Sequence, residues 1–296
     1  ILINYKNKFM EKSEFKILLI GTGLLGKSIS EKLLIEKFDL SIWNRTKSKY
    51  KDLIYKGAKE ISDIKKLSTK INTIILVLKD GKTSYSIIEG IENIENKVVI
   101  QMGTIGTYQS KKIESLVASK GAYYLESPVL GSVPESLAGE LLIMVGGNKN
   151  KFQKYKNLFL VLSKKLIYFG SVQQASACKL ALNYQIASLI YNFSITLRYL
   201  NESKVDLDLF MDFLRVSALY TPTYDKKFDR IKNHDYKNGN FNIENLSKDI
   251  NLFTKEINSM SIDGKSIELL NQILGQYKSS NLNNLDYSSI HELTSI

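Results

Sequence analysis

The feature that most constrains the fold is a glycine-rich stretch, ILLIGTGLLGKS, which joins an apolar run to a pattern with helical spacing. The apolar run, residues 15–21, predicts a buried β-strand. Its glycines follow the order G-x-G-x-x-G at Gly21, Gly23 and Gly26, which between a strand and a helix is typical of a turn that binds a pyrophosphate. Gly21 would allow the tight turn, Gly23 the close approach of the backbone to phosphate, and Gly26 the packing of helix on strand. A tight turn without a ligand is the alternative.

Strand and helix patterns alternate over the first half of the chain. Short apolar runs predict strands, and helical patterns separate most of them. The strands are expected at 15–21, 40–44, 71–80, 96–103, 122–128, 139–147 and 165–170, and the helices at about 24–38, 46–57, 106–121 and 154–165. This alternation predicts an α/β fold with a doubly wound, mainly parallel sheet covered by helices on both faces, the Rossmann arrangement.

The pattern changes after residue 170. Residues 173–202 predict one long, mostly apolar helix, and further helices are expected at about 206–217, 222–233, 243–259 and 262–278, with no convincing strand. The expected organisation is an N-terminal extension (1–14), a dinucleotide-binding domain (15–171) and an all-α substrate and dimerisation domain (172–296) led by the long interdomain helix. That helix is apolar over more than one face, which favours a homo-oligomer.

Charge and cysteine content narrow the partners and the compartment. The formal net charge is +11, but the 41 Lys and Arg residues are scattered among acidic residues without a nucleic-acid motif, so no nucleic-acid partner is expected. No apolar run reaches the ~20 residues of a membrane helix. The single cysteine, Cys178, suits a reducing cytoplasm. No metal-ligand spacing occurs, and His234 and His291 lie far from each other and from any acid–nucleophile pattern.

The end of the second expected strand bears on the choice of cofactor. An NAD site usually has Asp or Glu about 20 residues past the glycine loop, where it binds the ribose 2′-hydroxyl. This chain has Asn44, 18 residues after Gly26, followed by Arg45 and Thr46. An amide, a guanidinium and a hydroxyl can hold a 2′-phosphate that a carboxylate would repel. The sequence therefore favours NADP(H), while Thr46 could also act as a helix N-cap.

A lysine and an asparagine interrupt the apolar surface of the long expected helix. Lys179 and Asn183 lie four residues apart in GSVQQASACKLALNYQ, residues 170–185, so they share one helix face. An ammonium and an amide among Ala, Leu and Ile side chains face either water or a substrate.

Several further motifs, in the same order, resemble those of the β-hydroxyacid dehydrogenases. This family includes 3-hydroxyisobutyrate dehydrogenase and the glyoxylate/succinic semialdehyde reductases, and it is related to 6-phosphogluconate dehydrogenase. The resemblance covers about residues 15–294. ESPVLGSVPESLAGEL (126–141) is similar to the substrate loop, GSVQQASACKLALN to the catalytic helix with its K-x-x-x-N, FNIENLSKDINL (241–252) to a late F…KD motif, and VLKD (77–80) and MGTI (102–105) to loops beside the cofactor. The Gly-Ser pair after Leu130 and NRT at 44–46 most resemble the glyoxylate/succinic semialdehyde branch.

The resemblance implies a role for each matching residue. Lys179 would be the general acid that protonates the carbonyl oxygen as hydride reaches the carbon, and Asn183 would orient Lys179 or the substrate. The implied cofactor contacts are Gly21, Thr22, Gly23, Leu24, Leu25, Gly26, Asn44, Arg45, Thr46, Leu78, Lys79, Thr104 and Lys248. The implied contacts of a small carboxylate-bearing substrate are Thr104, Leu130, Gly131, Ser132, Lys179, Asn183, Phe241 and Asp249.

Leu130 departs from the family, which normally has a serine whose hydroxyl helps to hold the substrate carboxylate. Leucine cannot donate a hydrogen bond, so the N–H groups of Gly131 and Ser132 and the Ser132 hydroxyl would have to replace the serine hydroxyl.

The leading hypothesis is a cytoplasmic NADPH-dependent reductase of a small aldehyde acid, such as glyoxylate or succinic semialdehyde, that forms a homodimer or homotetramer. The alternatives are a 3-hydroxyisobutyrate-type dehydrogenase, an imine reductase, whose relatives commonly have another residue in place of Lys179, and a non-catalytic NADP-binding protein.

Overall fold

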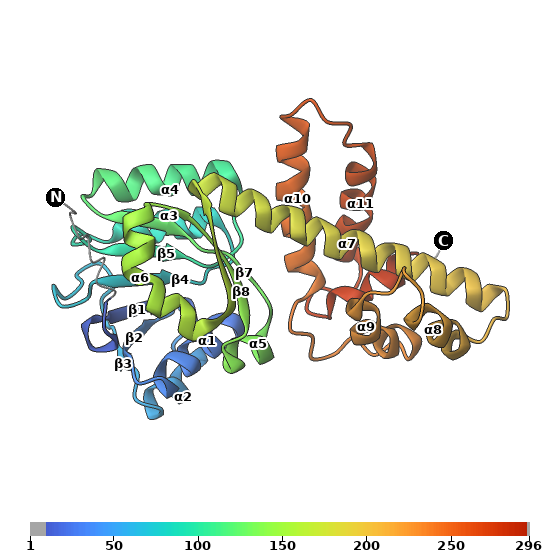
Figure 1. Ribbon diagram of the computed structural model, residues 1–296, viewed down its shortest axis with the longest axis horizontal. Helices are drawn as coiled ribbons and strands as arrows, with labels where there is room; N and C mark the ends of the chain where they lie inside the picture. Colours follow the sequence, from blue (N-terminus) through green and yellow to red (C-terminus); the bar gives the residue numbers. More distant parts are fainter. Residues whose placement is uncertain (1–9, 295–296) are drawn as a thin grey trace, which may run out of the picture. The chain divides into compact units, whose positions relative to one another are not determined.

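The computed structural model describes residues 10–294, which divide into two compact units, residues 10–179 and residues 180–294 (Figure 1). Residues 1–9 and 295–296, and with them most of the expected N-terminal extension, lie outside the described residues. The division falls within the long helix α7, Val172–Glu202.

The first unit contains a sheet of nine strands within its described residues. These are β1 Lys16–Ile20, β2 Asp39–Trp43, β3 Lys59–Glu60, β4 Thr73–Leu76, β5 Val98–Gln101, β6 Tyr123–Glu126, β7 Val129–Leu130, β8 Leu141–Gly147 and β9 Ser163–Gly170. Their order is β3-β2-β1-β4-β5-β6-β8-β7, and β9 pairs with β8. The strands from β3 to β6 are parallel, and β8 runs antiparallel to β6 and β7. The prediction of a mainly parallel Rossmann-type sheet is confirmed.

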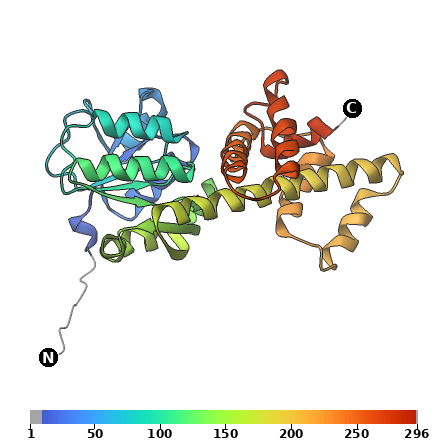
Figure 2. The ribbon, with the colours of Figure 1, turned by 90° about the horizontal axis from the view of Figure 1, so that it is seen from above.

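Helices cover both faces of this sheet, because alternate residues of the buried strands point to opposite sides. The helices are α1 Leu24–Ile35, α2 Lys51–Tyr55, α3 Gly81–Gly90, α4 Thr107–Ser119, α5 Val133–Ala138 and α6 Lys149–Leu162. Leu19 of β1 packs in one apolar layer with Leu33 of α1 and Phe159 of α6. Leu18 lies in the other layer with Ile113 of α4, and α3 and α4 lie side by side on that face (Figure 2).

The second unit is helical, as the sequence predicts. From residue 180 onward α7 packs with α8 Leu207–Arg215, α9 Pro222–Lys232, α10 Ile243–Asn258, α11 Lys265–Gly275 and the 3₁₀ helices η3 Gln276–Ser279 and η4 Tyr287–Thr294. Within its described residues the unit has no strand, and an isolated bridge joins Asn242 to Asp286. Of the helices in residues 10–294, none combines the length and the apolar character needed to cross a membrane.

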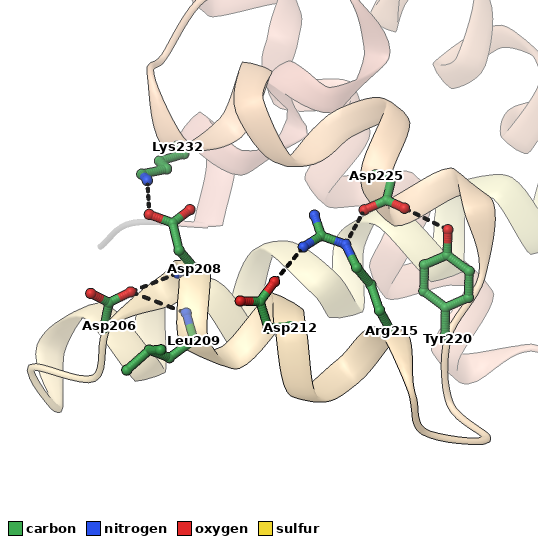
Figure 3. A network of polar contacts seen from close by, with 8 residues as sticks. All are labelled: Asp206, Asp208, Leu209, Asp212, Arg215, Tyr220, Asp225 and Lys232. Atoms are coloured by element: carbon green, nitrogen blue, oxygen red, sulfur yellow. Dashed lines mark hydrogen bonds and ion pairs between the residues drawn. The ribbon is translucent and has the colours of Figure 1, made fainter.

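Exposed polar contacts join α8 to α9 (Figure 3). The Arg215 guanidinium lies 3.0 Å from Asp225 of α9, and the Lys232 ammonium of α9 reaches Asp208 of α8. Asp206 caps α8 by accepting hydrogen bonds from the first backbone N–H groups of the helix. Since exposed ion pairs contribute roughly 0–1 kcal/mol each, these contacts orient the two helices more than they stabilise the unit.

The two histidines lie close together in the second unit, so the prediction that they are far from each other is wrong. Their ring centroids are 5.8 Å apart, because η4 brings the end of the chain back to the loop after α9. The Nδ1 atom of the exposed His234 lies 2.7 Å from Glu292 Oε1. Burial and the neighbouring Arg198 guanidinium lower the pKa of His291 to about 4, so His291 is uncharged at neutral pH.

Candidate functional site

The glycine loop between β1 and α1 has the geometry of an anion-binding turn. A Cβ atom on Gly21 would lie 2.3 Å from the Val77 carbonyl oxygen, and one on Gly26 would lie 1.9 Å from that of Gly21. Gly21 also has a φ of +99°, which L-side chains rarely adopt. In contrast, no atom lies within 4 Å of a Cβ placed on Gly23. Gly23 is the N-cap of α1 and provides no side-chain cap, so the N-cap residue leaves the first N–H groups of the helix to other partners, such as an anion.

Asn44 connects this loop to the end of β2. Its side-chain oxygen accepts a hydrogen bond from the Thr22 N–H at 3.3 Å, and its amide nitrogen donates to the Thr46 carbonyl at 3.0 Å. Both ends of the Asn44 amide therefore bind backbone groups, which connects the glycine loop to the loop after β2. Arg45 and Thr46 are exposed beside it, as are Leu24 and, in part, Leu25 at the start of α1.

The loops after β4 and β5 lie at the same edge of the sheet as the glycine loop, because β1, β4 and β5 are adjacent parallel strands. Leu78 is half-buried and Lys79 exposed after β4, and Thr104 is half-buried after β5. A Cβ on Gly103 would lie 2.4 Å from the Leu78 carbonyl oxygen, so the two loops are in direct contact. The structure thus groups the expected cofactor residues of the first unit.

The expected substrate loop contains a carboxylate that the sequence reasoning missed. Leu130 pairs with Leu142 in the sheet, and Gly131, with a φ of +129°, turns the chain into α5. The backbone N–H and the hydroxyl of Ser132 both donate to Glu135 Oε2, each at 2.8 Å. Both donors of Ser132 that were expected to replace the family serine are therefore bonded to the chain itself. The cause is a capping box at the start of α5, and its S-x-x-E spacing at 132–135 was visible in the sequence.

Lys179 lies on the part of α7 that belongs to the first unit, and its residue is only 7% exposed. A lysine is seldom buried to this extent in a fold unless its ammonium has polar surroundings. It follows Ser176 by one helical turn on the same face. This burial favours a functional role for Lys179 over a side chain that merely faces water.

In the second unit, Asn183, Lys248 and Asp249 lie together. The Asn183 amide nitrogen donates to Asp249 Oδ2 at 2.6 Å, and the Lys248 ammonium lies 2.7 Å from Asp249 Oδ1. Because a carboxylate only accepts hydrogen bonds, Asp249 fixes which way the amide points. Asn183 Oδ1 is buried without a hydrogen-bond partner and so remains an available acceptor. Phe241 is half-buried, with its ring 5.7 Å from that of Tyr287.

No metal centre is found among these residues. In residues 10–294 no group of three or more His, Cys, Asp or Glu side chains could hold a metal ion. A surface hollow of the first unit is lined by Glu11, Lys12, Ser13, Asn157, Leu160 and Val161, none of which is a candidate site residue.

Comparison with known families assigns both halves of the chain. Residues 16–170 match the NAD binding domain of 6-phosphogluconate dehydrogenase. Residues 174–294 match the domain described as NAD-binding of NADP-dependent 3-hydroxyisobutyrate dehydrogenase.

A curated relative and two solved structures match nearly the whole chain, the structures in fold. Glyoxylate/succinic semialdehyde reductase 1 of Arabidopsis thaliana is 28% identical, over 92% of this chain and 96% of its own length. The crystal structure of 3-hydroxyisobutyrate dehydrogenase from Salmonella typhimurium superposes with a TM-score of 0.84 at 13% identity, over 94% of this chain and 99% of that one. The structure of Psf3 in complex with NADP⁺ and 2-OPP gives a TM-score of 0.83 at 19% identity, over 94% of this chain and 100% of that one.

Proposed function

We propose that this chain, which belongs to the β-hydroxyacid dehydrogenase family, is an NADPH-dependent reductase of small aldehyde acids. As a member of that family it is an NAD(P)-dependent oxidoreductase that acts on the CH–OH group of hydroxyacids, with a small molecule as its substrate. The preference for NADPH, the direction of reaction and the substrate are the proposed parts. The observation that carries the proposal is the buried Lys179, in the same compact unit as the glycine loop.

Features of the first unit support a dinucleotide with a 2′-phosphate as the cofactor. The space beside Gly23 would let a pyrophosphate approach the N-terminus of α1. No acidic residue occupies the first turn of α1, so the positive end of the helix is not neutralised. At the end of β2, Asn44 is used to brace the loops, and the exposed Arg45 and Thr46 would bind the 2′-phosphate. Leu78, Lys79 and Thr104 would border the nicotinamide end.

The residues of the chain would act on the carbonyl group as follows. NADPH, when bound, supplies the hydride to the carbonyl carbon. Lys179 would donate a proton to the carbonyl oxygen as negative charge develops there, and would thereby stabilise that charge. Asn183, held by Asp249, would offer its side-chain oxygen to the Lys179 ammonium or to a substrate hydroxyl. The hydroxyacid product would leave with the proton from Lys179.

The similarity to glyoxylate/succinic semialdehyde reductase 1 supports aldehyde acids as the substrate class. A carboxylate is the natural second group by which such a small molecule could be held, and the N–H of Gly131 would attract it. The decisive experiment is NADPH consumption by the purified chain with glyoxylate, succinic semialdehyde, methylmalonate semialdehyde and tartronate semialdehyde. Turnover of at least one of them supports the proposal, and NADPH binding without any turnover would favour the non-catalytic alternative.

We expect Arg45→Ala to weaken NADPH without affecting NADH. Loss of one charge-assisted hydrogen bond, about 1.5–3 kcal/mol, corresponds to a roughly 10–100-fold rise in KM for NADPH. Asn44→Asp should reverse the preference towards NADH, because a carboxylate repels the 2′-phosphate but can still accept from the Thr22 N–H. Arg215→Ala, which removes an exposed arginine of the second unit, is the control. Equal effects of Arg45→Ala on the two cofactors would contradict this assignment.

We expect Glu135→Gln to improve the use of carboxylate-bearing substrates. Glutamine keeps the capping box but removes the negative charge that lies beside Ser132. Relief of ~1 kcal/mol of repulsion predicts a roughly fivefold lower KM for glyoxylate. A neutral aldehyde should show no such change, and Leu130→Ser should add to the gain. An unchanged KM for glyoxylate would mean that its carboxylate binds away from this loop.

A homo-oligomer in the cytoplasm remains part of the proposal. Leu209, Phe213 and Val216 are 68%, 76% and 84% exposed, and their spacing places them on one face of α8 and the turn that follows. An apolar face of this kind is suited to burial against a second copy of the chain. Light scattering that shows a monomer at working concentrations would contradict it.

A further inference from the structure

The end of β6 contains a fully buried carboxyl group for which the proposed reaction has no use. Glu126 has no exposed surface. The hydroxyls of Ser110 and Tyr124 both donate to its Oε2 atom, each at 2.6 Å. The Ser176 hydroxyl also lies against the carboxyl and favours its charged form. Neither Glu126 Oε1 nor Ser176 Oγ has a hydrogen bond of regular geometry.

Glu126 touches three segments that each lead to a candidate site residue. Ser110 lies in the first turns of α4, six residues after Thr104. Glu126 itself ends β6, four residues before Leu130. Ser176 precedes Lys179 by three residues on α7, so the two side chains lie on one face of the helix. All of these residues belong to the first unit.

The surroundings of Glu126 favour a protonated carboxyl. Burial raises its pKa to about 8, and the hydroxyls of Ser110, Tyr124 and Ser176 oppose this shift only in part. Tyr124, whose own pKa is raised well above its usual value by burial and by Glu126, stays neutral beside it. On the neighbouring strand, Gln101 is the register partner of Glu126. The Gln101 amide nitrogen donates to the Gly103 carbonyl, and its oxygen is buried without a partner.

These oxygens need a donor. The Gln101 Oε1 atom can only accept hydrogen bonds, and the same holds for both Glu126 oxygens when the carboxyl is ionised; buried acceptors without partners are costly. A proton on Glu126 turns one of its carboxyl oxygens into a hydrogen-bond donor at the point where β5, β6, α4 and α7 meet. Ionisation would instead place a negative charge among hydroxyls alone, which draws in water or displaces the Ser176 turn.

We infer that Glu126 is a positioning residue that must hold a proton for the loop at Thr104, the substrate loop and the Lys179 turn of α7 to keep their active arrangement. Glu126 does not touch the reacting atoms; it acts through Ser110 and Ser176. Its deprotonation would lower activity reversibly at alkaline pH, separately from the titration of Lys179. The kinetic part of this inference rests on the proposed reductase function.

The kinetic test compares pH profiles of kcat/KM for wild type, Glu126→Gln and Ser176→Ala. Glutamine reproduces the shape of the neutral carboxyl and cannot ionise, so its activity at neutral pH should be close to that of wild type. The ratio of Glu126→Gln to wild type should rise to about tenfold one pH unit above the pKa of Glu126. Any titration of Lys179 cancels in this ratio.

The Ser176→Ala variant removes a group that lowers the pKa of Glu126, so the alkaline decline of its activity should move to higher pH. The control is Ser194→Ala, at another buried serine of α7, which should leave the decline where it is in wild type.

A second measurement needs neither turnover nor a variant that folds. Infrared difference spectra of wild type labelled with ¹³C-glutamate, recorded from neutral to alkaline pH, should show the C=O stretch of one protonated glutamic acid that disappears near the pKa of Glu126. A ratio of kcat/KM that stays flat with pH, or the lack of a protonated glutamic acid at neutral pH, would overturn the inference. Failure of the proposed reductase function would leave the infrared result unchanged, so the two failures are distinguishable.

Discussion

Replacement of Lys179 by alanine should lower kcat by about 10²–10⁴-fold, the usual contribution of a general acid. The cause is the loss of the proton donor and of the charge that stabilises the developing oxyanion. Because Lys179 is assigned to the chemical step, the affinity for NADPH should change little. The measurement is steady-state NADPH consumption with a saturating aldehyde acid, together with NADPH binding followed by fluorescence.

Two further variants sharpen this prediction. Lys179→Arg retains a positive charge but cannot give up its proton at working pH, so it should be nearly as inactive as Lys179→Ala. Lys154→Ala, at an exposed lysine of α6, controls for the loss of one positive charge from the same unit. Wild-type kcat in Lys179→Ala would remove Lys179 from the reaction, and weakened NADPH binding at normal kcat would make it a cofactor ligand instead.

Replacement of Lys227 by methionine should destabilise the second unit by about 3–5 kcal/mol, the cost of leaving one member of a buried ion pair without its partner. The Lys227 ammonium of α9 lies 2.8 Å from both carboxylate oxygens of Asp286, and their side chains are only 13% and 2% exposed. Asp286 also accepts from the N–H and the hydroxyl of Ser288 at the start of η4. The pair therefore fixes the end of the chain to α9.

Lys232→Met is the matched control, because it makes the same substitution on the same helix. Its partner Asp208 is 63% exposed and Lys232 itself 37% exposed, so the loss should be within ~1 kcal/mol. Chemical denaturation of both variants, followed by the helical signal, gives the comparison. Similar small losses in the two variants would show that the Lys227–Asp286 pair is not the main attachment of η4.

The features predicted correctly from the sequence are those in which each residue's neighbours along the chain decide the structure. The runs at 15–21 and 71–80 contain β1 and β4, because the centre of a parallel strand that is buried on both faces is apolar. The glycine loop was predictable because Gly21 has a positive φ and a Cβ atom on Gly26 would collide with the Gly21 carbonyl oxygen. The long helix α7 followed from its length and apolar character.

The features that were missed depend on contacts between distant segments or on short elements. The helices α3 and α5 and the two-residue strands β3 and β7 are too short or too polar to show a clear period. Asn183 and Asp249 are separated by 66 residues, and nothing in either local pattern indicates their hydrogen bond. For the same reason the closeness of His234 and His291 was not foreseen.

For Ser132 the sequence indicates the residue type but not its hydrogen-bond partner. The sequence indicated a donor in the substrate loop, and the donor is present. Its hydrogen bonds to Glu135 change what it can offer, because a carboxylate of the chain competes with that of the substrate. Which partner a polar group takes depends on local geometry, and residue type alone does not determine it.

We propose that the chain passes hydride from NADPH to the carbonyl carbon of an aldehyde acid, with Lys179 as the proton donor. The most direct test of this proposal is a single-turnover reaction with NADPH that carries deuterium at the transferred position, with glyoxylate and succinic semialdehyde as acceptors. We expect wild type to form a hydroxyacid product with one deuterium on the former carbonyl carbon, and Lys179→Ala to form almost none in the same time. Bound NADPH that transfers no deuterium to either acceptor in the wild type would contradict it.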